Sequence, residues 1–163
     1  MGHVGVFSFG APKIITTGQG GCIITNDVGL SERVHAIKNF GRTVGVGEVY
    51  NVMGMNFKFT DLQASFGVEQ MRKLPEIVER KKEIYDLYWR ELSDVVDFVP
   101  TDLLEATPTY PEILVENRDE LAEHLRGMHI GCRAVYDSLT AQPFHSKWKT
   151  ATPTTDYIGA RGL

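Results

Sequence analysis

Residues 8–21 read SFGAPKIITTGQGG, and this stretch decides the fold of the chain. An apolar, strand-like run leads into it, Lys13 stands near its middle, and glycines at Gly18, Gly20 and Gly21 end it. Glycine lets backbone approach a ligand or another strand closely. The stretch therefore presents one amine in a turn that follows a strand. The glycines beside it let the backbone come close to a ligand or to another strand.

The segments around this stretch predict alternating strand and helix. Short apolar, partly β-branched runs predict strands over residues 4–9 and 22–25. Apolar residues at helical spacing then predict a helix over 30–40, which Gly41 ends. Residues 42–56 carry several glycines and little periodicity, so we expect a long loop, and such loops in compact domains are usually functional or mobile.

A capping box predicts the next helix. Thr60 and Gln63 have the spacing in which two side chains satisfy each other's backbone N–H groups. The helix is expected to run to about residue 74, where Pro75 either opens a second helix or kinks the first. Residues 76–93 are rich in charge with one apolar stripe, which is typical of a long surface helix.

The second half has a different character, a small α+β unit. Strands are expected over residues 95–99, 112–115 and 131–136. A second capping box at 117–120 opens a helix that Gly127 can cap, and a short helix is expected at 156–161. The sequence therefore predicts a first domain over 1–94, including the long linking helix, and a second over 95–163.

Composition excludes several functional classes. Lys+Arg 17 against Asp+Glu 21 gives a net charge of −4 without a basic stripe, so nucleic acid is not an expected partner. No run of about 18 apolar residues is present, and the first residues do not resemble a signal peptide, so a cytoplasmic protein without a membrane span is expected. Cys22 and Cys132 are expected to be buried, reduced thiols.

Common motifs do not explain the lysine and glycine stretch. The glycines are not followed by the Lys-Ser/Thr of a Walker loop or by the helix of a dinucleotide fingerprint. The five histidines do not have metal-ligand spacing, so no metal site is expected, and Ser8 has no Asp/His pair nearby. Lys13 is then either a solvated surface charge or a covalent catalyst that forms a Schiff base with a carbonyl such as that of pyridoxal phosphate.

Several ordered blocks resemble the signature of the DegT/DnrJ/EryC1/StrS aminotransferases, which are pyridoxal-phosphate-dependent sugar aminotransferases. These blocks are GVFSF (5–9), Lys13, TTGQGG (16–21), TND (25–27), KNFGR (38–42), GMNFKFTDLQA (54–64), QMRKL (70–74), RDEL (118–121) and YDSLTAQP (136–143). They cover nearly all of the chain in the family's order.

The resemblance implies a fold and an activity. The fold is α/β: a partial pyridoxal-phosphate-dependent transferase of fold type I, with the remnant of the large domain followed by a small α+β C-terminal domain. The implied reaction transfers an amino group, with glutamate as donor, to a nucleotide-linked keto sugar in sugar or cell-surface polysaccharide biosynthesis. The cofactor is pyridoxal 5'-phosphate, and the family's active form is a dimer.

The resemblance also assigns roles to residues. Lys13 matches the lysine that forms the Schiff base with the cofactor and shuttles the proton, and Ser8 matches a ligand of the cofactor phosphate. Asn56 matches a residue that reaches the phosphate of the partner subunit's cofactor. Lys58 stands where many members carry arginine, so it keeps the charge of a carboxylate-binding residue without the bidentate fork. Tyr136 lies in a loop that borders the family's substrate site.

Family members are roughly twice this length. The resemblance therefore implies that the sequence lacks the family's N-terminal half and its last C-terminal segment. A catalytically inactive fragment, or half of a split enzyme that needs its N-terminal half as a partner, is the alternative expectation. A sugar dehydratase of the same family is disfavoured, because those members replace the lysine with histidine and this chain has Lys13.

Overall fold

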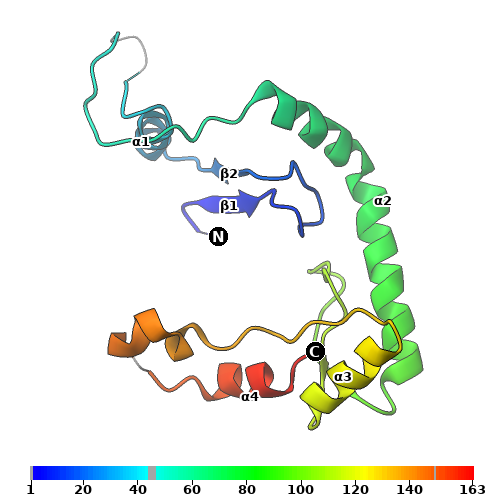
Figure 1. The fold of residues 1–163 in the computed structure, drawn as a ribbon. Coiled ribbons are helices and arrows are strands. Elements are labelled where there is room, and N and C mark those ends of the chain that lie inside the picture. Colours follow the sequence, from blue (N-terminus) through cyan, green and yellow to red (C-terminus); the bar gives the residue numbers. More distant parts are fainter. Residues whose placement is uncertain (1, 44–46, 149) are drawn as a thin grey trace. The chain divides into compact units, whose positions relative to one another are not determined.

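The computed structural model describes residues 2–43, 47–148 and 150–163 (Figure 1). The chain divides into two compact units, Met1–Ile77 and Val78–Leu163, which are described separately below. The change from one unit to the next falls inside one long helix, α2 (Asp61–Leu92). The domain boundary after residue 94 stays a prediction.

The first unit begins with a β-hairpin. Strands β1 (Gly5–Ser8) and β2 (Gly21–Ile24) pair antiparallel, with Gly5 opposite Ile24 and Ser8 opposite Gly21. Both predicted strands are confirmed, each to within a residue at its ends. Gly21 is required by close approach, because a Cβ there would lie 2.5 Å from the carbonyl oxygen of Phe7 on the paired strand.

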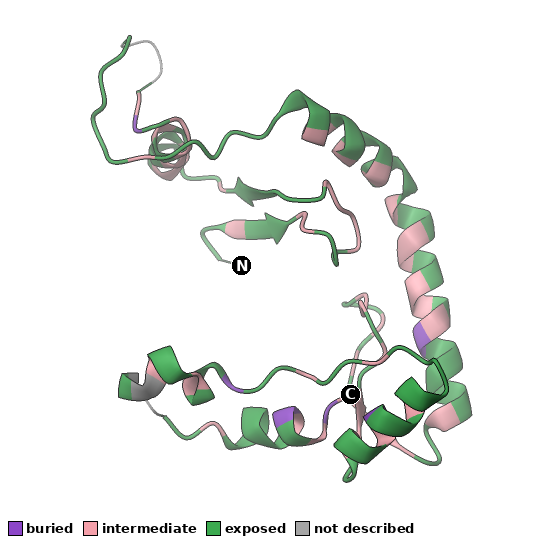
Figure 2. Ribbon diagram, in the orientation of Figure 1, coloured by how far each residue is buried: buried purple, intermediate pink, exposed green. Residues whose placement is uncertain are grey.

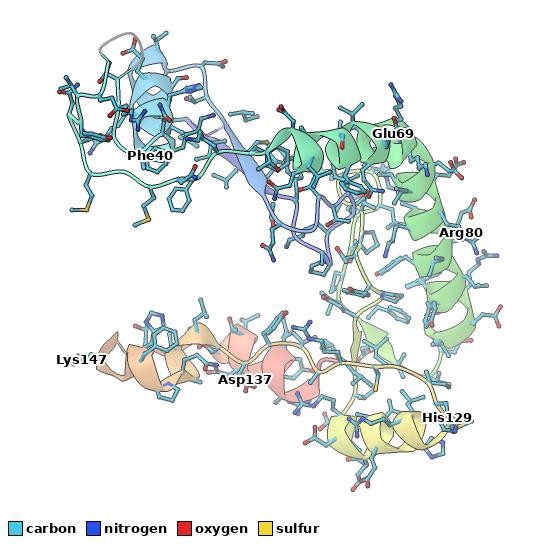
Figure 3. The ribbon with its side chains drawn as sticks, turned by 45° about the horizontal axis from the view of Figure 1, so that its top comes forward. Phe40, Glu69, Arg80, His129, Asp137 and Lys147 are labelled. Carbon is cyan, nitrogen blue, oxygen red and sulfur yellow. The ribbon has the colours of Figure 1, made fainter. Side chains whose placement is uncertain are left out.

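Helix α1 (Val28–Lys38) follows the hairpin. The Asp27 carboxylate accepts a hydrogen bond from the N–H of Leu30 at 2.9 Å, which caps the helix start. The helix ends two residues earlier than its apolar spacing predicts, and the chain then turns sharply with φ +62° at Phe40 and +86° at Gly41. The Phe40 side chain is labelled at this corner in Figure 3.

The segment after this corner is an irregular loop, as expected from its glycines. Isolated antiparallel bridges join Arg42 to Tyr50 and Asn39 to Asn56, so the loop folds back on its own beginning. Residues 44–46 of the predicted loop lie outside the described part of the chain.

Helix α2 begins with the predicted capping box. The Thr60 hydroxyl accepts a hydrogen bond from the backbone N–H of Gln63 at 3.2 Å. In return, the side-chain oxygen Oε1 of Gln63 accepts one from the backbone N–H of Thr60, also at 3.2 Å. The helix does not end near residue 74, however: it is one continuous helix with Pro75 inside it. Of the two outcomes expected at Pro75, a second helix that begins there is therefore wrong.

The second unit holds a two-stranded sheet against the C-terminal half of α2. Strands β3 (Asp97–Phe98) and β4 (Ile113–Leu114) pair antiparallel, with Phe98 opposite Ile113. The buried Tyr85 ring of α2 meets the Phe98 ring edge-on at 5.9 Å, and its hydroxyl donates to the carbonyl of Val99 at 3.3 Å. Two predicted strands are thus confirmed, as shorter pieces than expected.

Three expectations in this unit are wrong. Residues 131–136 form no strand, because Val135 donates its N–H to the carbonyl of Gly162 in the C-terminal segment instead of joining a sheet ladder. Helix α3 (Arg118–Gly127) starts without a side-chain cap at Asn117. It is capped at Met128 rather than at Gly127, and the left-handed residue is His129, with φ +61°.

The C-terminal segment completes the second unit. Short 3-10 helices at Leu139–Ala141 and Pro143–Trp148 lead to α4 (Pro153–Arg161), which begins three residues before the predicted 156–161 helix. Arg161 donates from Nε and Nη2 to the two carboxylate oxygens of Glu116, at 2.9 and 3.1 Å. These hydrogen bonds raise the pKa of the Arg161 guanidinium above its ordinary value.

Few of the described residues are buried (Figure 2). Among the described residues the buried apolar side chains are Tyr85 and Ala122, and both strands of the hairpin are largely exposed, with Val6 74% and Ile24 55% accessible. Cys22 is exposed and Cys132 is half-buried, so the expectation of two buried thiols is wrong; both are free. Within the described ranges, no helix is long and apolar enough to cross a membrane.

Candidate active site

The connection between β1 and β2 carries the candidate catalytic lysine. The connection closes at its base, where Phe9 donates its N–H to the carbonyl of Gly20 at 2.8 Å. One step further, the carbonyl of Phe9 accepts from the N–H of Thr17 at 3.0 Å and from the Thr16 hydroxyl at 3.1 Å. Residues 10–15 therefore form a small loop with a hydrogen-bonded neck, which we call the Lys13 loop.

Lys13 lies in a turn of this loop. Its N–H donates to the carbonyl of Gly10 at 3.1 Å, and Pro12, just before it, restricts the backbone of the turn. The side chain is exposed, and among the described residues its ammonium group has no hydrogen-bond or ion-pair partner. The structure thus fixes the backbone that carries the amine and leaves the amine free to meet a ligand.

Ser8 lies five residues before Lys13, at the end of β1. Its Oγ accepts a hydrogen bond from the N–H of Gly10 at 3.3 Å. The hydroxyl hydrogen is not used in that bond, so Ser8 can still donate to an anion. Ser8 and Gly10 connect the end of the strand to the start of the Lys13 loop.

Two glutamines of α2 hold the neck of the Lys13 loop. The Gln63 amide donates from Nε2 to the carbonyl of Gln19 at 3.0 Å, and Gln70 Oε1 accepts from the N–H of Thr16 at 3.3 Å. From the sequence, Gln63 is evident only as a capping residue, and Gln70 has no evident role. Their spacing of seven residues, two turns on one helix face, is the one sequence signal that they could act together.

Phe59 packs against the same connection. Its ring lies 6.3 Å from the Phe9 ring, and a Cβ at Gly20 would overlap its edge. Gly20 also has φ +134°, which L side chains rarely adopt, so the glycine is required here twice over. An open hollow of about 520 Å³ adjoins this contact; its lining is mostly apolar and includes Phe9, Ile15, Val68 and Met71.

Asn56 and Lys58 belong to a second cluster, around the corner at Phe40. The Lys58 ammonium lies 4.3 Å from the centre of the Phe40 ring and donates to Asn39 Oδ1 at 3.4 Å. The backbone of Asn56 forms its bridge with the same Asn39, while its exposed side-chain amide makes no hydrogen bond among the described residues. The cluster thus places an amide and a cation on one exposed surface.

The structure does not join these two groups within the described chain. No hydrogen bond or ion pair there connects Ser8 or Lys13 with Asn56 or Lys58. Tyr136 belongs to the second unit, where the residue is 72% exposed and the Arg133 guanidinium lies 4.3 Å from the centre of its ring. Within the described ranges, no three His, Cys, Asp or Glu side chains are grouped so that they could hold a metal ion.

Comparisons with known proteins give the chain relatives over its whole length. The family model described as the DegT/DnrJ/EryC1/StrS aminotransferase family matches residues 1–163. GDP-perosamine synthase of Escherichia coli O157:H7 is 30% identical over 100% of this chain and 46% of its own length. The dTDP-4-amino-4,6-dideoxy-D-glucose transaminase of Shigella dysenteriae is 28% identical over 83% of this chain and 38% of its own length.

A solved structure agrees with these sequence relatives. The crystal structure of a DegT DnrJ EryC1 StrS aminotransferase from Brucella abortus matches 99% of this chain with a TM-score of 0.91 and 25% identity, over 44% of its own chain. The predicted fold class is therefore confirmed: a partial α/β fold of the pyridoxal-phosphate-dependent aminotransferases. The chain spans about half the length of the curated relatives it matches.

Proposed function

The chain belongs to the DegT/DnrJ/EryC1/StrS aminotransferase family, and from that premise we propose that it provides the lysine-bearing part of an enzyme that aminates a nucleotide-linked keto sugar with pyridoxal phosphate. The observation that carries the proposal is Lys13, a free amine on a loop whose neck is hydrogen-bonded to α2. The activities for which the relatives are named, a perosamine synthase and a sugar transaminase, support a nucleotide sugar as substrate.

The residues present fit pyridoxal phosphate in two respects. An aldehyde cofactor needs a lysine amine that no ion pair holds, and Lys13 offers one. A phosphate needs hydrogen-bond donors, and the Ser8 hydroxyl still has its hydrogen to donate, only five residues before Lys13. We assign cofactor binding to Ser8 and Lys13 on this donor set.

Each residue then has a distinct task in the reaction. Pyridoxal phosphate, when bound, supplies the electron sink for the carbon that gains or loses the amino group. Lys13 Nζ would hold the cofactor through its aldehyde group and would serve as the base that moves a proton at the reacting carbon. Ser8 orients the phosphate, and the neck of the Lys13 loop keeps the amine in place.

Asn56 and Lys58 are assigned to a neighbouring subunit's site. Both are exposed on the Phe40 cluster, and within the described residues neither has a hydrogen bond to the Lys13 loop. We propose that the Asn56 amide reaches the cofactor phosphate of a second copy in a homodimer. Lys58 supplies a single positive charge for the carboxylate of the amino donor, which we propose to be glutamate, and Tyr136 borders the sugar site of the second unit.

The exposed hairpin supports a partner for this chain. Val6, Phe7, Ile23 and Ile24 are each about half or more exposed on β1 and β2, and sheet surfaces of this kind are normally covered. We propose that the covering polypeptide is a second copy or a chain bearing the N-terminal part of the family fold. Cell-surface polysaccharide or other sugar biosynthesis is the process in which such an enzyme would act, in the cytoplasm.

An absorbance titration with pyridoxal phosphate tests this function. Schiff-base formation shifts the absorbance band of the cofactor away from that of the free aldehyde. Added glutamate should then abolish the shifted absorbance band, because it donates its amino group to the cofactor. Lys13→Ala should show only the spectrum of free cofactor. A shifted band of equal size in Lys13→Ala, or none in the unsubstituted protein, contradicts the proposal.

A further inference from the structure

The neck of the Lys13 loop is held from one side by a pair of side chains on α2. Gln63 donates to the carbonyl of Gln19, at 3.0 Å, and Gln70 accepts from the N–H of Thr16, at 3.3 Å. One glutamine therefore uses its donor and the other its acceptor, so each is matched to the backbone group that it meets. Thr16 and Gln19 are thus residues at which the connection is hydrogen-bonded to the helix.

Thr16 is the junction of this arrangement. Besides the bond from its N–H to Gln70, its hydroxyl donates to the carbonyl of Phe9 at 3.1 Å and accepts from the N–H of Gly18 at 2.9 Å. The Phe9 carbonyl in turn accepts from Thr17. A displacement of Thr16 would therefore disturb its hydrogen bonds to Gln70, Phe9 and Gly18 at once.

Gln63 connects the helix start to the loop. Its Oε1 accepts from the N–H of Thr60 at 3.2 Å and pairs with the Thr60 hydroxyl at 2.9 Å, while its Nε2 bonds Gln19. All polar atoms of this side-chain amide are thus engaged, so its orientation is fixed by the helix cap. The first turn of α2 then sets where residues 18–21 lie, and these residues lead directly into β2.

From these contacts we infer that Gln63 and Gln70 are positioning residues, which act on the reaction through the Lys13 loop. The inference rests on the proposed function for its chemical consequence, since it assumes that the place of the Lys13 amine matters. Neither glutamine has a hydrogen bond to Lys13 among the described residues. Their effect is to reduce the conformations of the neck, so that the amine meets an aldehyde at a defined position.

The same substitution, glutamine to glutamate, distinguishes the donor role of Gln63 from the acceptor role of Gln70. Gln63→Glu keeps the acceptor for Thr60 and loses the donor to Gln19, whereas Gln70→Glu keeps the acceptor that Thr16 requires. Both variants add one negative charge to the same helix face. Gln70→Leu removes the acceptor, and Thr60→Val weakens the same helix cap while leaving the Gln63 amide donor in place.

Backbone amide exchange over residues 16–21 is the first measurement, and it needs no cofactor. Loss of one hydrogen bond should raise exchange by about tenfold in Gln63→Glu and in Gln70→Leu. Exchange should stay at the level of the unsubstituted protein in Gln70→Glu and in Thr60→Val. Equal exchange in the two Glu variants overturns the inference.

The rate of pyridoxal phosphate attachment to Lys13, trapped with borohydride, is the second measurement. Lys81 is the internal reference, because it belongs to the second unit, where its ammonium bonds the carbonyl of Thr109. Gln63→Glu should slow attachment at Lys13 several-fold without changing Lys81; equal rates in this variant and the unsubstituted protein overturn the inference. If Lys13 of the unsubstituted protein takes no label, the proposed function has failed, and amide exchange alone then decides whether the glutamines hold the loop.

Discussion

Gln63 on α2 donates a hydrogen bond to the backbone carbonyl of Gln19, 44 residues earlier in the chain, with its Nε2 3.0 Å from the carbonyl oxygen. The same side chain caps the helix through Thr60. The start of α2 and the connection that carries Lys13 are therefore fixed by one amide. Removal of the Gln63 amide should consequently disturb both the helix start and the connection.

Gly21→Ala should destabilise the first unit. Its new Cβ would lie 2.5 Å from the Phe7 carbonyl oxygen, a backbone atom that cannot move without disturbing the hairpin register. We expect a loss on the order of 2–3 kcal/mol in the free energy of unfolding, measured in urea. Gly18→Ala is the matched control: its φ is +78° but its surroundings are open, so it should cost only about 1 kcal/mol. Equal losses in the two variants contradict the packing of the hairpin.

Pro75→Ala should stabilise α2. Proline inside a helix lacks the N–H that would bond four residues back, and it costs about 3 kcal/mol relative to alanine in a helix interior. Because α2 continues through Pro75, alanine should raise the free energy of unfolding by up to about that amount. Pro153→Ala is the control, since Pro153 lies at the first position of α4, where the missing N–H has no partner to lose. If Pro75→Ala does not raise the free energy of unfolding, the helix is divided at residue 75 and the continuous α2 is contradicted.

Ser8→Ala should weaken pyridoxal phosphate binding without removing the lysine. A hydrogen bond to a charged group contributes about 1.5–3 kcal/mol, so the Kd should rise roughly ten- to a hundredfold. Pyridoxal, which lacks the phosphate, is the matched ligand: its Kd should be the same for the unsubstituted protein and for the Ser8→Ala variant. An equal rise for both ligands would show that Ser8 acts on the loop instead of on the phosphate.

Asn56→Asp should be rescued by a partner subunit. If the Asn56 amide serves the cofactor of the second copy, a dimer with Lys13→Ala in one subunit and Asn56→Asp in the other has one complete site. Mixing the two variants should therefore restore borohydride-trapped label on Lys13 that each variant alone lacks. If the mixture gives no more label than the sum of the separate variants, Asn56 does not act across a dimer.

Local rules predicted the parts of the fold that depend on neighbouring residues. The strands around the Lys13 stretch and the capping box at Thr60 and Gln63 follow from adjacent sequence, and both are confirmed. Pro75 shows the limit of such rules, because α2 continues where the proline alone favours a break. The amphipathic pattern on both sides of Pro75 outweighs the one hydrogen bond that proline removes.

Contacts between distant segments could not be predicted from the sequence. Residues 131–136 resemble a strand, but the N–H of Val135 bonds the carbonyl of Gly162, 27 residues later, so a single backbone contact replaces a sheet. Gln70 reaches Thr16 across 54 residues, and nothing near either residue signals the pairing. The sequence motifs predict roles for Lys13 and Ser8. The side chains that hold the Lys13 loop, in contrast, are evident only in the structure.

Borohydride trapping of pyridoxal phosphate, followed by peptide mapping, tests the central claim most directly. With the unsubstituted protein, we predict one dominant phosphopyridoxyl label, on Lys13, and its loss in Lys13→Ala, while Lys13→Ala keeps the amide exchange of residues 16–21 unchanged. A label spread evenly over the exposed lysines, or one of equal yield in Lys13→Ala, would contradict the assignment of Lys13 as the cofactor lysine.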